Sequence, residues 1–304
     1  MRKAKNKVET LLLKGKAVSD AIRSSLEPRV KALKEDGIVP KLVAILVGDD
    51  PASRVYVRSK ARAFEQLSCK SQTFTLDVDS SEVNILELID RLNHDDEIHG
   101  ILVQLPLPSH LDSKKILHSV SPDKDIDGFH PQNLGLLLEG NPSFIPCTPH
   151  GVLEILKFYN IPVSGRHAVI IGRSNIVGKP MFALLAQKFE MGNATVTICH
   201  TGTKDLIAHT KRADILIAAA GSPGIITGEM VRKGVDIVDV GINRVDDDSE
   251  KGYKLVGDVE TDSVMGIAHS VTPVPGGVGP MTIAMLLSNT VFSAEKCRRL
   301  ERAA

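Results

Sequence analysis

The sequence has only four cysteines and no long apolar segment, and each of these two shortages excludes a class of protein. The cysteines are far apart and form no C-x-x-C pair, so a disulfide framework is not expected. No apolar run reaches the roughly 18 to 20 residues that a membrane span needs. We therefore expect a globular protein without a membrane segment, located in a reducing compartment, with the cytoplasm as the first choice.

The chain also lacks a net charge, because 37 Lys and Arg balance 37 Asp and Glu. This balance argues against nonspecific binding of nucleic acid. The ten histidines show no metal-ligand spacing, so no metal is expected. Residues 1–7 are basic, but no apolar signal core follows them. A solvated helix start is the preferred interpretation, and an organelle signal stays open.

Short apolar runs alternate with helical patterns along the 304 residues, which are enough for two domains. Helices are predicted over 8–35, 52–67, 83–92, 109–120, 147–158 and 283–297. Strands are predicted over 41–47, 72–78, 100–103, 168–171, 194–199, 213–220, 235–240 and 268–271. Such alternation predicts an α/β fold with mostly parallel sheets. The domains are expected over 1–147, completed by a returning C-terminal helix at 281–304, and over 148–280.

A glycine-bounded turn after the strand over 168–171 is the clearest cofactor signal. Gly172 ends the strand, and a helix with Pro180 in its first turn follows Gly178. Such a corner directs helix N–H groups and the helix dipole at an anion. The usual G-x-G-x-x-G spacing is absent, because Ser174 replaces the second glycine. A corner without a ligand therefore stays open on this pattern alone.

The next strand, over 194–199, indicates which dinucleotide binds. NAD-specific sites often carry Asp or Glu near this strand end, where a carboxylate bonds the ribose 2′-hydroxyl. This chain instead has Thr201 and Thr203 there, with Arg173 on the glycine turn. Hydroxyls and a guanidinium suit a 2′-phosphate, so NADP is the predicted cofactor.

Three polar residues share one face of the helix predicted over 52–67. Ser53, Tyr56 and Lys60 fall within a stripe roughly 60° wide at about 100° per residue. The helix follows a strand end, as Gln104 does, and ligands bind at strand ends in open α/β sheets. Lys60 would act as a base if burial or charge lowered its pKa. A tyrosine beside a solvated surface lysine is the alternative that spacing leaves open.

Two loops are candidates for ligand contact. In the acidic loop, Asp123, Asp125 and Asp127 match the opening of an EF-hand, but Leu134 stands where the bidentate glutamate belongs. Loop solvation, or one carboxylate bound to a polar heterocycle, is favoured over a metal. The loop over 275–280 has so little side chain that its backbone can approach a ligand closely. A plain tight turn is the alternative.

Five motifs in register resemble the bifunctional methylenetetrahydrofolate dehydrogenase/methenyltetrahydrofolate cyclohydrolase family, over nearly the whole chain. They cover residues 53–60, 100–108, 123–129, 172–180 and 275–282. The resemblance implies NADP-dependent oxidation of 5,10-methylenetetrahydrofolate and hydrolysis of the methenyl product to 10-formyltetrahydrofolate, in one-carbon metabolism and purine biosynthesis. It also implies a folate-binding catalytic domain, a Rossmann-like NADP domain with a doubly wound parallel sheet, a cleft between them, and a homodimer.

The same resemblance implies roles for single residues. Lys60 is central to hydrolysis, Gln104 tunes its protonation, and Tyr56 stacks on the folate rings. The remaining substrate residues are Ser53, Asp127, Gly276 and Gly277, with Asp127 on the pterin. The cofactor residues are Gly172, Arg173, Ser174, Gly178, Thr201 and Ile242, with Arg173, Ser174 and Thr201 on the 2′-phosphate. The family usually has serine at 201 and often lysine at 150, where this chain has Thr201 and His150.

Other functions differ from this one in motif order or in motif content. Short-chain dehydrogenases share Tyr-x-x-x-Lys, but their glycine corner precedes it, which excludes them here. A shikimate-dehydrogenase-like NADP oxidoreductase has the observed domain order, but needs a corner nearer to G-x-G-G. A non-enzymatic NADP-binding regulator would keep the corner at Gly172 and would have no reason for Lys60, Gln104 and Asp127 to converge.

Overall fold

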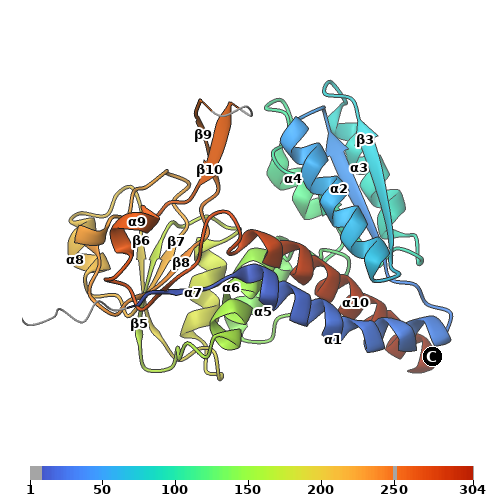
Figure 1. Cartoon of the computed structure of the whole chain (residues 1–304). Helices are drawn as coiled ribbons and strands as arrows, with labels where there is room; N and C mark the ends of the chain where they lie inside the picture. Colours follow the sequence, from blue (N-terminus) through green and yellow to red (C-terminus); the bar gives the residue numbers. More distant parts are fainter. Residues whose placement is uncertain (1–8, 249–251, 304) are drawn as a thin grey trace, which may run out of the picture. The chain divides into compact units, whose positions relative to one another are not determined.

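The computed structural model describes residues 9–248 and 252–303 (Figure 1). Their contacts divide the chain into two compact units. One comprises residues 9–19 and Thr148–Thr282, and we call it the six-stranded unit. The other comprises Asp20–Cys147 and residues 283–303, and we call it the three-stranded unit.

All strand pairs in the sheet of the six-stranded unit are parallel, and the strand order is β1-β11-β8-β7-β5-β6. The strands are β1 (Leu11–Leu12), β5 (His167–Ile171), β6 (Thr195–Cys199), β7 (Ile215–Ala218), β8 (Asp236–Asp239) and β11 (Ser270–Val271). The chain runs from β5 to β6 on one side and then returns to place β7 on the other side of β5. This reversal is the switch point at which doubly wound sheets bind ligands.

Short helices and one hairpin complete this unit. The helices are α6 (Cys147–Phe158), α7 (Gly178–Ala186), α8 (Leu206–Thr210), the 3-10 turn η1 (Gly228–Met230) and α9 (Thr261–Val264). The antiparallel hairpin of β9 (Asn243–Asp246) and β10 (Tyr253–Val256) stands away from the sheet (Figure 1). The sequence predicts a hairpin-like loop over 246–251, of which residues 249–251 lie outside the described residues.

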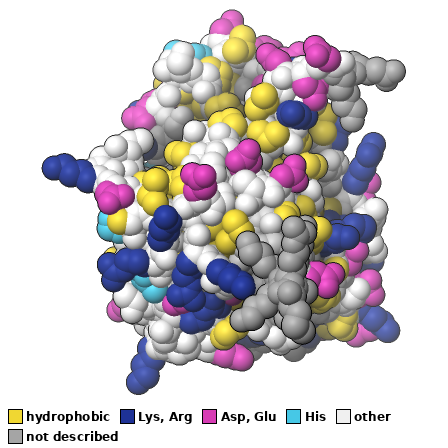
Figure 2. Space-filling model, turned by 60° about the vertical axis from the view of Figure 1, so that its left-hand side comes forward, with side chains coloured by type: hydrophobic (Ala, Val, Ile, Leu, Met, Phe, Trp, Pro, Cys, Tyr) yellow, Lys and Arg dark blue, Asp and Glu magenta, His cyan; other side chains and the backbone are white. Residues whose placement is uncertain are grey.

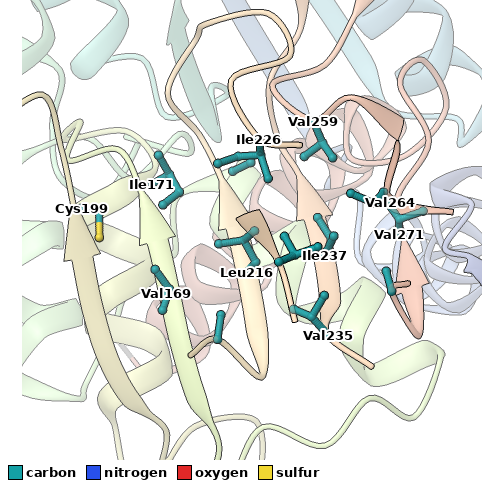
Figure 3. Close-up of a cluster of buried hydrophobic side chains, with 14 residues drawn as sticks. Val169, Ile171, Cys199, Leu216, Ile226, Val235, Ile237, Val259, Val264 and Val271 are labelled. Atoms are coloured by element: carbon teal, nitrogen blue, oxygen red, sulfur yellow. The ribbon is translucent and has the colours of Figure 1, made fainter. Parts of the chain in front are cut away.

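The core of the six-stranded unit consists of aliphatic side chains from neighbouring strands (Figure 3). Val169 and Ile171 of β5 pack with Leu216 of β7 and Ile237 of β8. Every residue of β7 and β8 is buried. Parallel strands covered on both faces need apolar runs, which is why β7 reads Ile-Leu-Ile-Ala without alternation, while β8 begins and ends with buried aspartates.

The three-stranded unit contains the parallel strands β2 (Lys41–Val47), β3 (Lys70–Leu76) and β4 (Gly100–Val103), with β2 in the centre. Its helices are α2 (Pro51–Gln66), α3 (Glu82–Asn93), α4 (Ser113–Ser119), α5 (Pro131–Glu139), most of α1 (Gly15–Glu35) and most of α10 (Gly279–Ala303). Ile85 and Ile89 of α3 pack on Val43, Ile45 and Ile101 of the sheet. The apolar face of α3 thus covers one face of the sheet.

The predicted α/β class with parallel sheets is confirmed, and the chain start is a correction. The sequence predicts one helix over 8–35 and assigns the start to the first domain. In the structure Leu11–Leu12 form β1 beside β11, and α1 begins only at Gly15. Thr10 Oγ1 also donates to the Ala268 carbonyl at 2.8 Å. Partners 258 residues away cannot be read from local periodicity.

The surface of the described residues carries charges of both signs. Figure 2 shows Lys and Arg side chains interspersed with Asp and Glu on one face. This mixture agrees with the balanced composition. Of the helices in the described part of the chain, none combines the length and apolarity that a membrane crossing requires.

Candidate active site and cofactor corner

The helix that carries Lys60 begins directly after the central strand of its sheet. Asp50 caps α2, since its carboxylate accepts from the Ser53 N–H at 2.7 Å, and Pro51 occupies the first helical position. Ser53 and Lys60 are only 5% and 4% exposed. A lysine is rarely buried to this extent, so Lys60 is not the solvated surface lysine of the alternative interpretation.

The Lys60 amine has two neighbours, which come from different elements. Its Nζ donates to Gln104 Oε1 at 3.0 Å, and it lies 4.7 Å from the centre of the Tyr56 ring. Gln104 follows β4, and its Nε2 donates to the Leu105 carbonyl at 2.7 Å. That bond orients the amide so that its oxygen faces the lysine. The structure therefore brings Tyr56, Lys60 and Gln104 together.

Burial shifts the titration of this cluster. It lowers the pKa of Lys60, and the negative charge of Asp127 opposes the shift. Burial also raises the pKa of Asp127 to about 6, against the opposing effect of the Lys60 ammonium. A lysine that loses its proton more easily than a solvated one can accept a proton in a reaction.

The three aspartates of the acidic loop separate into different roles. Asp125 is buried and accepts from the N–H groups of Phe129 and His130 and from Asn133 Nδ2, so it holds the loop together. Asp123 pairs with Lys296 at 2.6 Å. Of the three, Asp127 is the one coupled to the charge of Lys60. Among residues 9–248 and 252–303, no group of three or more acidic, histidine or cysteine side chains could hold a metal.

Cys147 is a site residue that the sequence interpretation missed. It is 2% exposed, begins α6, and its thiol donates to the Ile126 carbonyl at 3.4 Å, next to Asp127. Burial raises the pKa of this thiol well above its ordinary value, and the Asp127 carboxylate adds to the effect. Its place at the start of α6 was visible in the sequence, but its proximity to Asp127 depends on the fold.

The glycines of the predicted cofactor corner are required by the packing of the turn. Gly172 has φ +123°, and a Cβ there would lie 2.1 Å from the Ala219 carbonyl oxygen. A Cβ on Gly178 would lie 2.2 Å from the Gly172 carbonyl oxygen. Ser174 occupies the place of the second fingerprint glycine, and its Oγ accepts from the N–H of Val177 at 3.1 Å. A hydroxyl that accepts in this way keeps its own proton to donate.

The candidate 2′-phosphate residues follow two adjacent strands. Arg173 follows β5 and Thr201 follows β6, whose ends pair Ile171 with Cys199. Arg173, Ser174 and Thr201 are all exposed. Thr203 is only partly exposed, and its Oγ1 accepts from the His200 N–H at 2.8 Å. Of the two threonines, Thr201 is thus the better phosphate ligand, and the residues present fit an NADP 2′-phosphate.

Ile242 shares a cavity with the glycine loop over 275–280. The cavity measures about 220 Å³ and is lined by residues that include Ile242, Gly276 and Gly277. The structure thus brings together a predicted cofactor residue and two predicted substrate residues. Asp239 also lines it, and burial raises the pKa of this carboxyl to about 6. Its carboxylate accepts from the N–H groups of Gly241, Asp258 and Val259, which holds the backbone before Ile242.

Comparison with known proteins decides the family. The catalytic domain model of tetrahydrofolate dehydrogenase/cyclohydrolase matches residues 13–127, and the NAD(P)-binding domain model matches residues 146–298. This chain belongs to the tetrahydrofolate dehydrogenase/cyclohydrolase family. The resemblance inferred from the five motifs is therefore confirmed. Ser53, Tyr56, Lys60 and Gln104 lie within the catalytic match, which ends at Asp127.

Full-length relatives of this family agree in sequence and in structure. The bifunctional protein FolD of Chlorobium chlorochromatii is 51% identical over 294 residues, covering 95% of this chain and 100% of its own. The bifunctional FolD structure from Campylobacter jejuni has a TM-score of 0.89 and 51% identity, covering 94% of this chain and 99% of its own. The Trypanosoma brucei FolD, complexed with NADP and an inhibitor, has a TM-score of 0.90 and 36% identity, covering 96% and 99%.

Proposed function

We propose that this chain oxidises 5,10-methylenetetrahydrofolate with NADP and hydrolyses the 5,10-methenyltetrahydrofolate product to 10-formyltetrahydrofolate. The observation that carries the proposal is the buried Lys60 amine, held by Gln104 and Tyr56 in a member of the tetrahydrofolate dehydrogenase/cyclohydrolase family. The glycine corner in the NAD(P)-binding match supports the redox half. The tetrahydrofolate one-carbon derivatives are therefore the proposed substrates.

In the first reaction the residues of this chain bind and orient the folate. When bound, the nicotinamide accepts the hydride that leaves the one-carbon bridge. Tyr56 offers its ring face to the folate ring system, and Asp127 bonds the polar edge of the pterin. Ser53 is a further proposed substrate residue of the three-stranded unit, and Gly276 and Gly277 are proposed substrate residues of the six-stranded unit. Alignment of this kind supplies a large part of the rate in a reaction between two bound partners.

Selectivity for NADP is assigned to the surface of the glycine corner. The Arg173 guanidinium can hold the 2′-phosphate with two hydrogen bonds, and the hydroxyls of Ser174 and Thr201 can donate to it. Gly172 and Gly178 shape the turn, and Ile242 is proposed to contact the cofactor beyond it. Because no carboxylate follows β6 within three residues, nothing there favours a free ribose 2′-hydroxyl.

In the second reaction water attacks the methenyl carbon and must lose a proton. We assign that proton to Lys60, whose pKa burial lowers. The carbon–nitrogen bond to N5 then breaks, N5 takes up a proton, and the formyl group remains on N10. Gln104 suits this role because its amide oxygen holds the amine in either protonation state. A carboxylate in its place would favour the ammonium form.

One absorbance experiment tests the proposal. Mixing the protein with methylenetetrahydrofolate and NADP should produce methenyl absorbance and NADPH, and methenyltetrahydrofolate added alone should decay faster than in buffer. NADPH formation with shikimate instead would support the oxidoreductase alternative. NADP binding without either reaction would support the regulator. Either of these results would overturn the proposal.

We also propose which domain binds folate and which binds NADP, as the family implies. The proposed folate-binding catalytic domain comprises residues 20–147 completed by 283–303, and the proposed NADP domain comprises 148–282 with the chain start over 9–19, a division that the two compact units support. The proposed assembly is a homodimer, which light scattering of the purified protein tests. The proposed location is the cytoplasm, and the free thiols of all four cysteines suit a reducing compartment.

A further inference from the structure

Asn289 joins the two segments that place Asp127 and Cys147. This side chain lies on α10 and is 6% exposed. Its Nδ2 donates to the Ile126 carbonyl at 2.7 Å and to the Ile145 carbonyl at 3.1 Å, and it lies 3.7 Å from the Cys147 sulfur. An amide nitrogen has two N–H donors, so these two carbonyls use both.

The Ile126 carbonyl belongs to the peptide group that joins Ile126 to Asp127. Ile126 is 0% exposed, so water does not compete for its carbonyl. That carbonyl also accepts from the Cys147 thiol at 3.4 Å, and loss of Asn289 would leave this buried acceptor with the weaker thiol donor alone. The second carbonyl, of Ile145, lies two residues before Cys147 and the start of α6. One side chain therefore holds the backbone next to Asp127 and the backbone that leads to Cys147.

Other contacts of α10 with the acidic loop lie outside the charged cluster. Ser293 Oγ donates weakly to the Asp123 carbonyl at 3.4 Å, and Lys296 Nζ pairs with the Asp123 carboxylate at 2.6 Å. Both contacts hold residue 123, at the far end of the loop from Asp127. Of these three α10 contacts, only that of Asn289 reaches the peptide next to Asp127.

We propose that Asn289 is a positioning residue of the folate site, which sets the Asp127 carboxylate relative to Lys60 by fixing the Ile126 carbonyl. The inference rests on the proposed function, because it assigns Asp127 to the pterin. A displacement of about 1 Å at a substrate-orienting group can cost on the order of a hundredfold in rate. The cofactor corner lies in the other unit, so NADP binding is independent of Asn289.

The test compares Asn289→Leu with Thr290→Val. Thr290 is its neighbour on α10, is 0% exposed, and bonds only within its own helix, to the Leu286 carbonyl. We expect Asn289→Leu to raise the KM for methylenetetrahydrofolate about tenfold or more in the dehydrogenase assay, with the NADP Kd unchanged. Thr290→Val should lower the melting temperature and leave this KM unchanged.

A double-mutant cycle shows whether Asn289 acts through Asp127. Asn289→Leu added to Asp127→Asn should cause no further rise in KM. A further rise in KM when Asn289→Leu is added to Asp127→Asn would overturn the inference and leave the proposed function intact. A KM for Asn289→Leu equal to that of Thr290→Val would do the same. Wild-type protein inactive in both reactions would overturn both. If Asn289→Leu does not fold, Asn289→Ser keeps one donor and should show a smaller rise in the same KM.

Discussion

Lys60 is a buried lysine, and its neighbours determine whether its amine can act as a base. Burial lowers its pKa, while the Asp127 charge opposes the shift. Gln104 holds the amine at 3.0 Å without a charge of its own. The residue therefore has the placement of a base rather than that of a structural ion pair, for which a directly bonded carboxylate would be expected.

Substitution of Lys60 tests this assignment directly. Lys60→Met keeps a similar length and removes the amine, so hydrolysis of methenyltetrahydrofolate should fall about a hundredfold or more. The control is Arg58→Met, an exposed cation on the same helix, which should retain the wild-type rate. Decay of the methenyl absorbance measures both. A Lys60→Met protein with normal hydrolysis would remove this residue from the mechanism.

The pH dependence of hydrolysis should respond to Asp127. In the wild type, hydrolysis should rise with pH as Lys60 loses its proton, and the Asp127 charge raises the pKa of Lys60. Asp127→Asn removes that charge, so the Lys60 pKa falls and the rise of kcat moves to lower pH. Measurement of kcat from pH about 5 to 9 at saturating folate checks this. A shift toward higher pH would contradict the assignment.

Arg173 should decide between the two dinucleotides. Arg173→Ala removes a charged donor for the 2′-phosphate, so NADP affinity should fall about 10- to 100-fold while NAD affinity changes little. Calorimetric titration with each dinucleotide measures this without the folate reaction. Lys179→Ala, an exposed cation on α7, is the control. Equal losses for NAD and NADP would show that Arg173 does not read the phosphate.

At the scale of elements, the cofactor corner combines two strand ends and one helix start. The turn after β5 passes so close to the loop after β7 that a Cβ on Gly172 would meet the Ala219 carbonyl oxygen. Ser174 bonds the N–H of Val177 where a standard fingerprint has glycine. The unusual spacing therefore still gives a turn that a side-chain hydrogen bond holds just before α7 begins at Gly178.

Gly172→Ala should disrupt this corner. Its φ of +123° and the 2.1 Å approach to Ala219 require the backbone to move, so we expect a stability loss of about 1–3 kcal/mol and weaker NADP binding. Gly165→Ala is the control, because its φ is +76° with nothing within 4 Å of the added Cβ. That variant should cost only about 1 kcal/mol and leave NADP affinity unchanged. Thermal unfolding and NADP titration distinguish the two.

At the scale of the whole molecule, the six-stranded unit contains segments from opposite ends of the sequence. β1 pairs with β11, and Leu13 donates its N–H to the Val271 carbonyl. The three-stranded unit likewise includes α10 residues from the C-terminal part of the chain. Each unit is therefore completed by a segment distant in sequence, which makes its stability sensitive to the chain ends.

Leu13 tests the contribution of the chain start. Leu13→Ala removes a side chain that is 0% exposed, so it should cost about 2–5 kcal/mol. The control, Leu12→Ala, removes a neighbour that is 36% exposed and should cost much less. Thermal unfolding with and without NADP shows which unit is affected, because a ligand protects the unit that binds it. Equal effects of both substitutions would contradict the role of this segment.

The predictable part of the fold and site follows from local chemistry. Val169 and Ile171 predicted a buried strand because parallel strands covered on both faces need apolar runs. The spacing of Tyr56 and Lys60 on one helix predicted their contact. β1 and the Cys147–Asp127 contact were missed, since both depend on partners distant in sequence. Helix periodicity could not indicate that residues 11–12 would join a sheet.

The sequence by itself determined the α/β class, the glycine corner and the family, because periodicity, turn chemistry and motif order are local properties of the chain. Only the tertiary structure decided that Lys60 is buried against Gln104, that Asp127 of the three aspartates is coupled to it, and that Asn289 supports this loop. Burial and long-range hydrogen bonds depend on which distant segments pack together. That packing, through desolvation, makes an ordinary lysine a candidate base.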